Sequence, residues 1–224
     1  MTLYLSRLRL SRKPSAQALD KILNPPDPGP RLDAHHRLLW AAFTDSPNRR
    51  RDFLWREERA GEFLALSVRP PTPGDLFETP QVKDFAPQLV RGDRLAFALR
   101  ANATRERKNA GRVDVVMDAL HALPKEARLS ERMVLAQREG AAWLARQGEA
   151  AGFRLIGAEV GDYSAISLPG RRGPRAGQPQ FGILDVTGAL EITDPAAFLA
   201  RLAMGFGRAK AFGCGLMLIR RAPS

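Results

Sequence analysis

The sequence predicts an α+β protein made of two tandem ferredoxin-like (βαββαβ) domains, at residues 1–102 and 103–224. The first observation behind this prediction is the order of elements in the first half, which reads strand, helix, strand, strand, weak helix, strand. The second is that the other half follows a similar order, although the sequence itself does not repeat. Hydrophobic residues make up 44% of the 224-residue chain, which is enough for two separate cores.

The first half contains apolar patterns of both the strand and the helix period. Its expected elements are a strand at 2–10, a Pro-rich connection ending at 24–31, a helix at 32–43, a hairpin of strands at 52–58 and 62–69, a weakly supported helix between 75 and 88, and a strand at 94–101. Leu32, Leu39 and Phe43 fall on one face of the expected helix, and one of two adjacent histidines joins them. Asp33 suits the N-cap of this helix.

The elements expected in the second half are predicted from the same apolar patterns. Its expected elements are a short strand at 112–116, a long helix at 130–152, strands at 153–160 and 163–168, a strand at 181–192, a helix at 194–204 and a final strand at 215–221. Asp194 suits the N-cap of the shorter helix, because Pro195 follows at the first helical position, where its missing N–H costs nothing. An arginine-bearing turn precedes the strand at 181–192.

The charge balance points to a polyanionic partner. Lys and Arg outnumber Asp and Glu by 35 to 24, which gives a net charge of +11 and favours nucleic acid ahead of an anionic membrane surface. No run of about 18 apolar residues occurs, so no membrane-spanning helix is expected. The N-terminus lacks the apolar core of a signal peptide, and a cytoplasmic location is expected. The single Cys214 excludes an internal disulfide and a cysteine-cluster metal site.

Histidine chemistry centres on the adjacent pair His35 and His36 in the first expected helix. Neighbouring helical residues point about 100° apart, so only one of the pair can face a given site while the other packs or meets solvent. At a helix start, partly positive backbone N–H groups would lower the pKa of such a histidine. No Cys-x-x-Cys, His-x-x-x-His, dense carboxylate cluster or Gly-x-Ser-x-Gly motif occurs. Neither a metal site nor a serine hydrolase is therefore expected, and no cofactor is.

Two glycine- and arginine-rich stretches are candidates for anion binding. The turn LPGRRGPRAGQPQ carries Arg171, Arg172 and Arg175, and the stretch GFGRAKAFGCG carries Gly205, Gly207, Arg208, Lys210, Gly213 and Gly215. The turn could lie along a nucleic-acid groove with its cations on phosphates, or be an ordinary flexible basic loop. The glycines could let an anion approach the backbone, or close a sheet in a tight turn. The arginines at 49–51 are interpreted as a solvated loop more readily than as a binding element. Few aromatic residues are present, which favours recognition of a shaped RNA backbone over splayed bases.

The segments GFGRAKAFGCGLM, HRLLWAAF and LAFALRANAT, with the helix ending AAWLARQGEAAGF, resemble the CasE endoribonucleases of type I-E CRISPR systems. These belong to the repeat-associated RNA-binding proteins, and the resemblance follows family order along the whole chain. It implies two ferredoxin-like domains and metal-independent cutting of precursor CRISPR RNA at the 3′ base of the repeat stem-loop. Attack by the RNA's own 2′-hydroxyl would leave 2′,3′-cyclic phosphate and 5′-hydroxyl ends. The implied partners are the repeat RNA stem-loop, which stays bound, and the other subunits of the Cascade complex.

The resemblance also assigns residues. The catalytic histidine would be His36, because His36-Arg37-Leu38-Leu39-Trp40 has the family spacing; His36 could act as general acid or general base. Arg37, the arginines of the turn, and the glycines and cations of the glycine-rich stretch would bind RNA. Some family members have a tyrosine three residues before the histidine, where this chain has Asp33.

Two other functions remain open from the sequence. A non-catalytic RNA-binding subunit of the same superfamily would share the fold and the glycine-rich stretch, but would not need His36 in its motif. A basic DNA-binding regulator would need a helix-turn-helix or a similar reading element, and none is recognisable.

Overall fold

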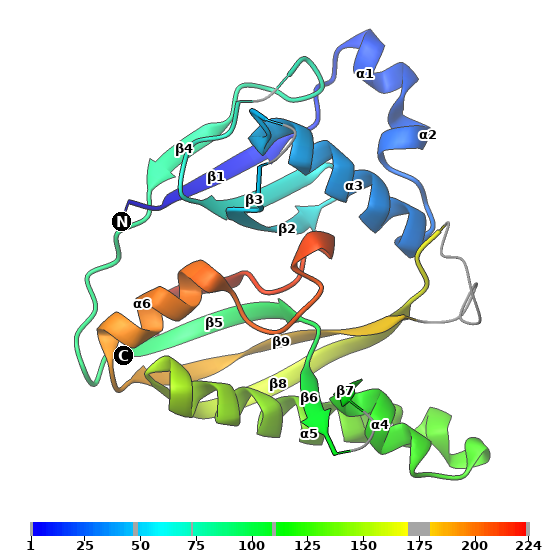
Figure 1. Cartoon of the computed structure of the whole chain (residues 1–224), viewed down its shortest axis with the longest axis vertical. Coiled ribbons are helices and arrows are strands. Elements are labelled where there is room, and N and C mark those ends of the chain that lie inside the picture. Colours follow the sequence, from blue (N-terminus) through cyan, green and yellow to red (C-terminus); the bar gives the residue numbers. More distant parts are fainter. Residues whose placement is uncertain (1, 47–48, 73, 109–110, 170–179, 223–224) are drawn as a thin grey trace. The chain divides into compact units, whose positions relative to one another are not determined.

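The computed structural model describes residues 2–46, 49–72, 74–108, 111–169 and 180–222. It is an α+β fold of two compact units, each built around a four-stranded antiparallel sheet (Figure 1). The first unit holds the described residues of Met1–Pro87, Ser167–Gln178 and Lys210–Gly213; the second holds those of Gln88–Ile166, Pro179–Ala209 and Cys214–Ser224. None of the helices in the described residues is both long and apolar enough to cross a membrane.

The first sheet has the strand order of a ferredoxin-like domain. Its strands are β1 (Tyr4–Arg9), β2 (Phe53–Arg59), β3 (Glu62–Ser67) and β4 (Gln81–Asp84), in the order β2-β3-β1-β4. Two short helices, α1 (Pro14–Ala18) and α2 (Asp20–Leu23), and the long helix α3 (Pro28–Phe43) connect β1 to β2. The α3 face packs on the sheet, with Phe43 stacked on Phe53 at 4.3 Å between ring centroids. The predicted first strand and the predicted hairpin are confirmed.

The helix predicted between 75 and 88 is wrong, because the edge strand β4 occupies part of that segment. All four of its residues are exposed, so β4 is held by backbone pairing with β1 and carries no apolar pattern that the sequence could show. Among the described residues, the first unit therefore lacks the second helix of the ferredoxin-like pattern.

Helix α3 begins earlier than expected, at Pro28, with Asp27 as its N-cap. The Pro-rich segment forms its first turn, where a proline's missing N–H costs no hydrogen bond. Asp33 therefore lies inside the helix, and its prediction as an N-cap is wrong.

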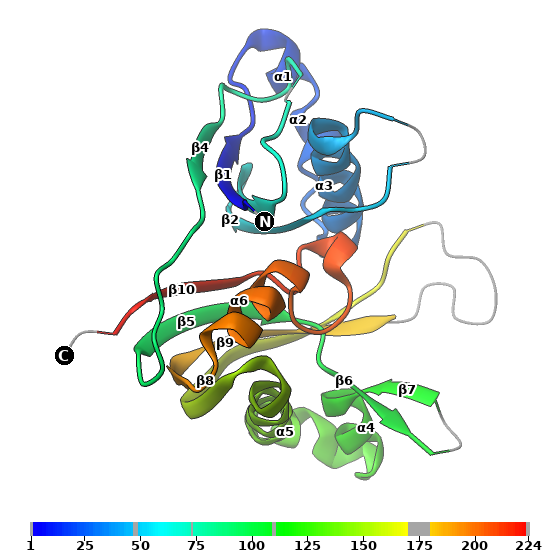
Figure 2. The ribbon, with the colours of Figure 1, turned by 60° about the vertical axis from the view of Figure 1, so that its left-hand side comes forward.

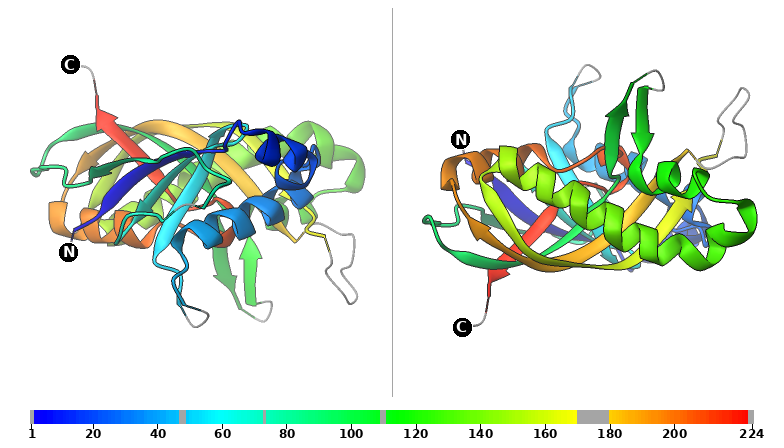
Figure 3. Two further views of the ribbon diagram at one scale, coloured as in Figure 1. Left: turned by 90° about the horizontal axis from the view of Figure 1, so that it is seen from above. Right: turned by 90° about the horizontal axis from the view of Figure 1, so that it is seen from below.

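The second sheet completes a full ferredoxin-like pattern. Its strands are β5 (Arg94–Ala101), β8 (Phe153–Ile166), β9 (Phe181–Ile192) and β10 (Met217–Arg221), in the order β10-β5-β9-β8. Helix α5 (Arg128–Ala151) lies between β5 and β8 in the chain, and α6 (Pro195–Met204) lies between β9 and β10. Helix α5 runs across one face of the sheet and contacts α6 (Figure 3).

The expected domain boundary at 102/103 differs from the observed division. The strand predicted to close the first domain, β5, pairs instead with β9 and β10. The first unit's main segment ends at Pro87. Alternating apolar and polar residues identify a strand but not the sheet that it joins, because the strands that pair with it are distant in the sequence.

The segment that follows β5 forms a hairpin of its own. Strands β6 (Thr104–Arg107) and β7 (Gly111–Asp114) make a separate two-stranded ribbon (Figure 2). The predicted strand at 112–116 thus ends at Asp114, where helix α4 (Val115–His121) begins. A short 3₁₀ turn, Lys125–Ala127, leads from α4 to α5. The two strands predicted at 153–160 and 163–168 are one strand, β8, interrupted by bulges.

Asp114 and Asp194 cap helices α4 and α6 in the same way. Each accepts hydrogen bonds of 3.0 Å at Oδ1 from the backbone N–H groups two and three residues further on. Asp114 is in addition surrounded by other donors, namely Tyr163 Oη at 3.1 Å, Asn102 Nδ2 at 3.0 Å and Gly182 N at 3.1 Å. The predicted Asp194 cap is confirmed, and Asp114 joins α4 to β8, to β9 and to the residue that follows β5.

Candidate functional site

The two adjacent histidines of α3 have opposite surroundings, as the helical geometry predicts. His35 is fully buried and meets Phe63 edge-on at 4.8 Å and Trp55 at 6.3 Å between ring centroids. Neither of its ring nitrogens has a hydrogen-bond partner among the described residues. Burial, and secondarily the charge of Arg31, lowers the pKa of His35 to about 4. His35 is therefore a neutral residue of the first core.

His36 lines a pocket on the other side of α3. The pocket has a volume of about 590 Å³ and is lined by His36, Arg37, Trp40, Ala41, Thr44 and Arg51. The His36 ring lies 5.6 Å from the ring of Phe212 and 6.3 Å from that of Trp40. Two cationic side chains can bind an anion, and a half-buried imidazole beside them can transfer a proton to or from it.

Arg51 is the closest charged partner of His36. Its Nη2 lies 3.0 Å from His36 Nδ1, and its Nη1 donates to the Lys210 carbonyl at 2.9 Å. The guanidinium also lies over the rings of Trp40 and Phe53, at 5.4 and 5.1 Å from their centroids. Separate segments of the first unit thus hold this side chain. Because a guanidinium has only donors, Nδ1 must be the accepting nitrogen of His36.

The surroundings of His36 lower its pKa below the usual range. Burial is the largest cause, and the charge of Arg51 is the second; Arg37 adds to the lowering. The charge of Asp33 and a hydrogen bond to the backbone of Ala211 act in the opposite direction. The expected cause, a helix start, does not apply: His36 lies about two turns inside α3, and the helix dipole acts mainly within the first turn.

Arg37 points away from the helix into solvent. Its side chain is 74% exposed, and Nη2 lies 2.5 Å from Asp33 Oδ2, one turn earlier on α3. An exposed pair of this kind contributes little to stability, so Arg37 can turn to a phosphate at small cost. Asp33 thus pairs with Arg37 in this chain.

The glycine-rich stretch is divided between the units: Gly205, Gly207, Arg208 and Gly215 belong to the second, and Lys210–Gly213 to the first. All four of its glycines have a positive φ, and two of them also pack too closely for a side chain. Gly207 has φ +71°, and a Cβ there would lie 2.5 Å from the Asn102 carbonyl oxygen; Gly213 has φ +74° and would bring a Cβ to 3.2 Å from the Trp55 ring. Close packing in a left-handed conformation therefore explains these positions without a ligand.

Several backbone N–H groups of this stretch already have partners. Gly205 N donates to Arg201 O at 2.8 Å, and Gly215 N donates to Arg100 O at 2.7 Å. In this conformation both N–H groups donate to backbone carbonyls, and RNA binding by the glycines of this stretch stays a prediction. An RNA contact by the side chains of Arg208 and Lys210 stays a prediction.

In the first unit, the Ala211 carbonyl accepts from Trp55 Nε1 at 3.2 Å, which fixes the short helix η2 (Lys210–Phe212) against β2.

Of the other predicted residues, Arg171, Arg172 and Arg175 lie outside the residues that the structure describes. Arg51, interpreted from the sequence as part of a solvated loop, instead lies in the pocket of His36 and belongs to the candidate site. The sequence does contain a sign of this position. If the alternation of side chains along β2 is continued back toward the N-terminus, Arg51 falls on the same side of the strand as Phe53. Its neighbour Arg49 does lie in solvent, paired with Asp45.

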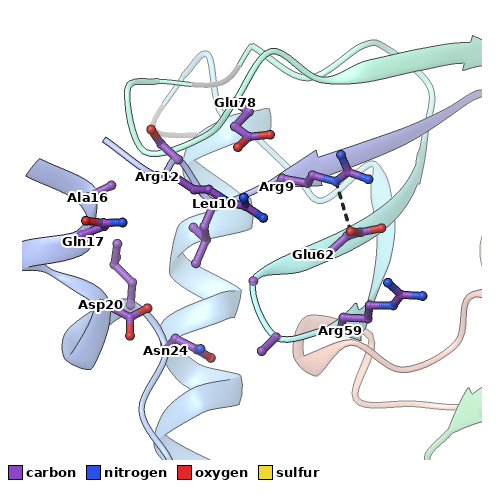
Figure 4. Close-up of a pocket in the computed structure, with 14 residues that line it drawn as sticks. Arg9, Leu10, Arg12, Ala16, Gln17, Asp20, Asn24, Arg59, Glu62 and Glu78 are labelled. Carbon is purple, nitrogen blue, oxygen red and sulfur yellow. Dashed lines mark hydrogen bonds and ion pairs between the residues drawn. The ribbon is translucent and has the colours of Figure 1, made fainter. Parts of the chain in front are cut away.

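A second pocket of the first unit, about 760 Å³, lies beside α1, α2 and the turn between β2 and β3 (Figure 4). Its lining has three arginines and three carboxylates, of which Arg9 and Glu62 form an ion pair at 3.1 Å between Nε and Oε2, and the described residues lining it include no histidine. Nowhere among the described residues do three or more His, Cys, Asp or Glu side chains gather closely enough to hold a metal ion. The candidate site is therefore at His36.

Comparison with known proteins gives matches along the chain. The model of a family described as CRISPR-associated protein matches residues 3–221. The chain is 35% identical over 145 residues to the CRISPR-associated endoribonuclease Cse3 of Thermus thermophilus, covering 61% of this chain and 60% of the relative. It is 28% identical over 193 residues to the CRISPR system Cascade subunit CasE of Escherichia coli, covering 81% of this chain and 88% of the relative.

Solved structures of related proteins also resemble this chain. The structure of Thermus thermophilus Cse3 bound to an RNA representing a pre-cleavage complex has a TM-score of 0.69 and 25% identity, with both chains covered completely. The structural match extends over the part of the Thermus protein that the sequence match leaves out. Since the family model spans nearly the whole sequence, the chain belongs to the CRISPR-associated protein family.

Proposed function

We propose that this protein is a metal-independent endoribonuclease that processes precursor CRISPR RNA at the 3′ base of the repeat stem-loop. The observation that carries the proposal is the environment of His36, a half-buried imidazole in a pocket with Arg37 and Arg51. Relatives named as an endoribonuclease and as a Cascade subunit support the substrate class. By the same analogy, the product RNA stays bound and the protein joins the other Cascade subunits.

The proposed reaction uses the nucleophile that RNA carries. The 2′-oxygen attacks the adjacent phosphorus, the bond from phosphorus to the 5′-oxygen breaks, and a 2′,3′-cyclic phosphate and a 5′-hydroxyl result. One proton leaves the 2′-hydroxyl and one is delivered to the 5′-oxygen. His36 carries out one of these transfers, while the positive charges of Arg37 and Arg51 stabilise the extra negative charge on the phosphate. Correct alignment of the 2′-oxygen supplies much of the remaining rate.

The test compares the two histidines in single-turnover cleavage of the repeat RNA, with saturating enzyme and excess chelator. His36→Ala should lower the rate by about 10²–10⁴-fold with unchanged RNA affinity in filter binding, because backbone contacts dominate such interfaces. His35→Ala should lower the melting temperature through a core cavity, yet cleave RNA at temperatures where it stays folded.

Three outcomes would overturn the proposal. Normal cleavage by His36→Ala would remove the histidine mechanism. Tight binding of repeat RNA by the wild-type protein without cleavage would favour a non-catalytic RNA-binding subunit. Cleavage that stops in chelator and returns with magnesium, while binding is unchanged, would show that a metal ion takes part.

A further inference from the structure

The hydrogen bond between Arg51 and His36 has a consequence for the proton on the imidazole. In the RNA-free protein the Arg51 guanidinium lies 3.0 Å from Nδ1 and can only donate. Nδ1 must then present a lone pair, so a neutral ring carries its single proton on Nε2. In this state Nε2 cannot accept a proton, and Nδ1 cannot bind one without displacing a guanidinium N–H.

We infer that Arg51 is a positioning residue that holds His36 in one neutral tautomer until a phosphate of the RNA takes over the guanidinium hydrogen bond. This inference rests on the proposed function. Phosphate is the matched competitor because its oxygens accept charge-assisted, often bidentate, hydrogen bonds from Arg, which an imidazole nitrogen cannot equal. Once Nδ1 is released, it can bind a proton. The imidazolium can then give a proton to the leaving 5′-oxygen, or the neutral ring can carry its proton on Nδ1 and accept one from the 2′-hydroxyl at Nε2.

The contacts of Arg51 suit such an exchange. The Lys210 carbonyl holds Nη1 at 2.9 Å, and the rings of Trp40 and Phe53 flank the guanidinium. These contacts keep the side chain at the pocket while Nη2 changes partner. A guanidinium has five N–H donors, of which these two hydrogen bonds use two, so a phosphate can be met while the Lys210 hydrogen bond is kept.

Other charged groups also act on His36. Asp33 and Arg37 face it from α3 and oppose each other, and the imidazole donates a hydrogen bond to the backbone of Ala211 in η2. Arg51 lowers the pKa of His36 both by its charge and by its place at Nδ1. Removing Arg51 should therefore raise the pKa of His36, and a phosphate that neutralises Arg51 should do the same.

The experiment measures the protonation and tautomer of His36 directly, by NMR of the imidazole nitrogens in the full-length protein. In the free protein we expect the proton on Nε2 and a lone pair on Nδ1. Arg51→Met, which keeps an apolar side chain beside Trp40 and Phe53, should give a higher pKa for His36 and allow Nδ1 to bind a proton. Arg50→Met removes the same charge from the neighbouring exposed position and should change neither. The His35 signal serves as a reporter of the folded core in each variant.

The second arm adds repeat RNA that is 2′-O-methylated throughout, so that no 2′-hydroxyl can attack. Binding should raise the pKa of His36 in the wild-type protein, and the rise should be smaller in Arg51→Met, where the phosphate charge still acts on the imidazole but no guanidinium is drawn away from it. A proton on Nδ1 in the free protein, or an unchanged pKa in folded Arg51→Met, would overturn the inference. So would an RNA-induced rise of the same size in Arg51→Met. If the free-protein results hold but the RNA does not bind, the proposed function fails and the role of Arg51 in fixing the tautomer stands.

Discussion

At the scale of single residues, two identical side chains one position apart on α3 differ in burial and in the groups that they contact. His35 is enclosed by aromatic rings of the core, whereas His36 borders a pocket and contacts a guanidinium. The difference arises from the rotation of about 100° between neighbouring helical positions. One histidine therefore affects folding, and the other is available for chemistry.

The burial of His35 predicts a loss of stability in acid. Its pKa is about 4 in the folded protein, against an ordinary value of 6.5. Between these pH values the unfolded chain binds a proton that the folded chain does not, so the free energy of unfolding falls as pH drops from about 6.5 to about 4. At about 1.4 kcal/mol per pH unit, this group alone accounts for a loss of roughly 3 kcal/mol.

Urea denaturation of His35→Leu at pH 7 and pH 4.5 checks this. The variant should show a smaller difference in unfolding free energy between the two pH values than the wild-type protein. His121→Leu, which removes an exposed histidine, is the control and should keep the wild-type difference. Equal differences in all three proteins would show that His35 does not contribute to the acid sensitivity.

At the scale of elements, the two helix caps of the second unit should differ in importance. Asp194→Ala removes hydrogen bonds to two backbone N–H groups of α6 and should cost about 1 kcal/mol. Asp114→Ala removes an equivalent cap and leaves the donors of Asn102, Tyr163 and Gly182 without this acceptor, at about 1–3 kcal/mol for each buried group. Thermal and urea unfolding should rank Asp114→Ala as much the less stable, with Asp114→Asn between them. Similar losses for the two alanine variants would contradict the network.

The elements also show what a sequence can predict. The hairpin of β2 and β3, the helices α5 and α6 and the strand β9 were predictable because each has a clear apolar period. The edge strand β4 was not, since its exposed residues carry no period. For the candidate site, the family resemblance predicted His36, which stays a prediction, but Arg51 is brought to it by packing of the segment before β2 against α3. The partners of β5 likewise depend on contacts between distant residues.

At the scale of the whole molecule, the net charge of +11 predicts salt-sensitive RNA binding. For every phosphate that the protein no longer neutralises, the salt dependence of affinity should flatten by about 0.7–0.9 log units per tenfold change in salt. Replacing Arg171, Arg172 and Arg175 together by alanine should weaken binding and flatten this slope, as filter binding over a range of salt concentrations can measure. An unchanged affinity and slope would mean that this turn does not touch a phosphate.

The path of the chain through the first unit has a further consequence. Lys210–Gly213 belong to that unit although more than a hundred residues of the other unit precede them, and they supply the carbonyls that hold Arg51 and Trp55. A growing polypeptide therefore lacks these carbonyls until more than a hundred residues of the second unit have been synthesised. The helix that carries His36 is synthesised well before the segment whose carbonyl holds Arg51 beside it, so the surroundings of this histidine are completed late, after most of the second unit has been made.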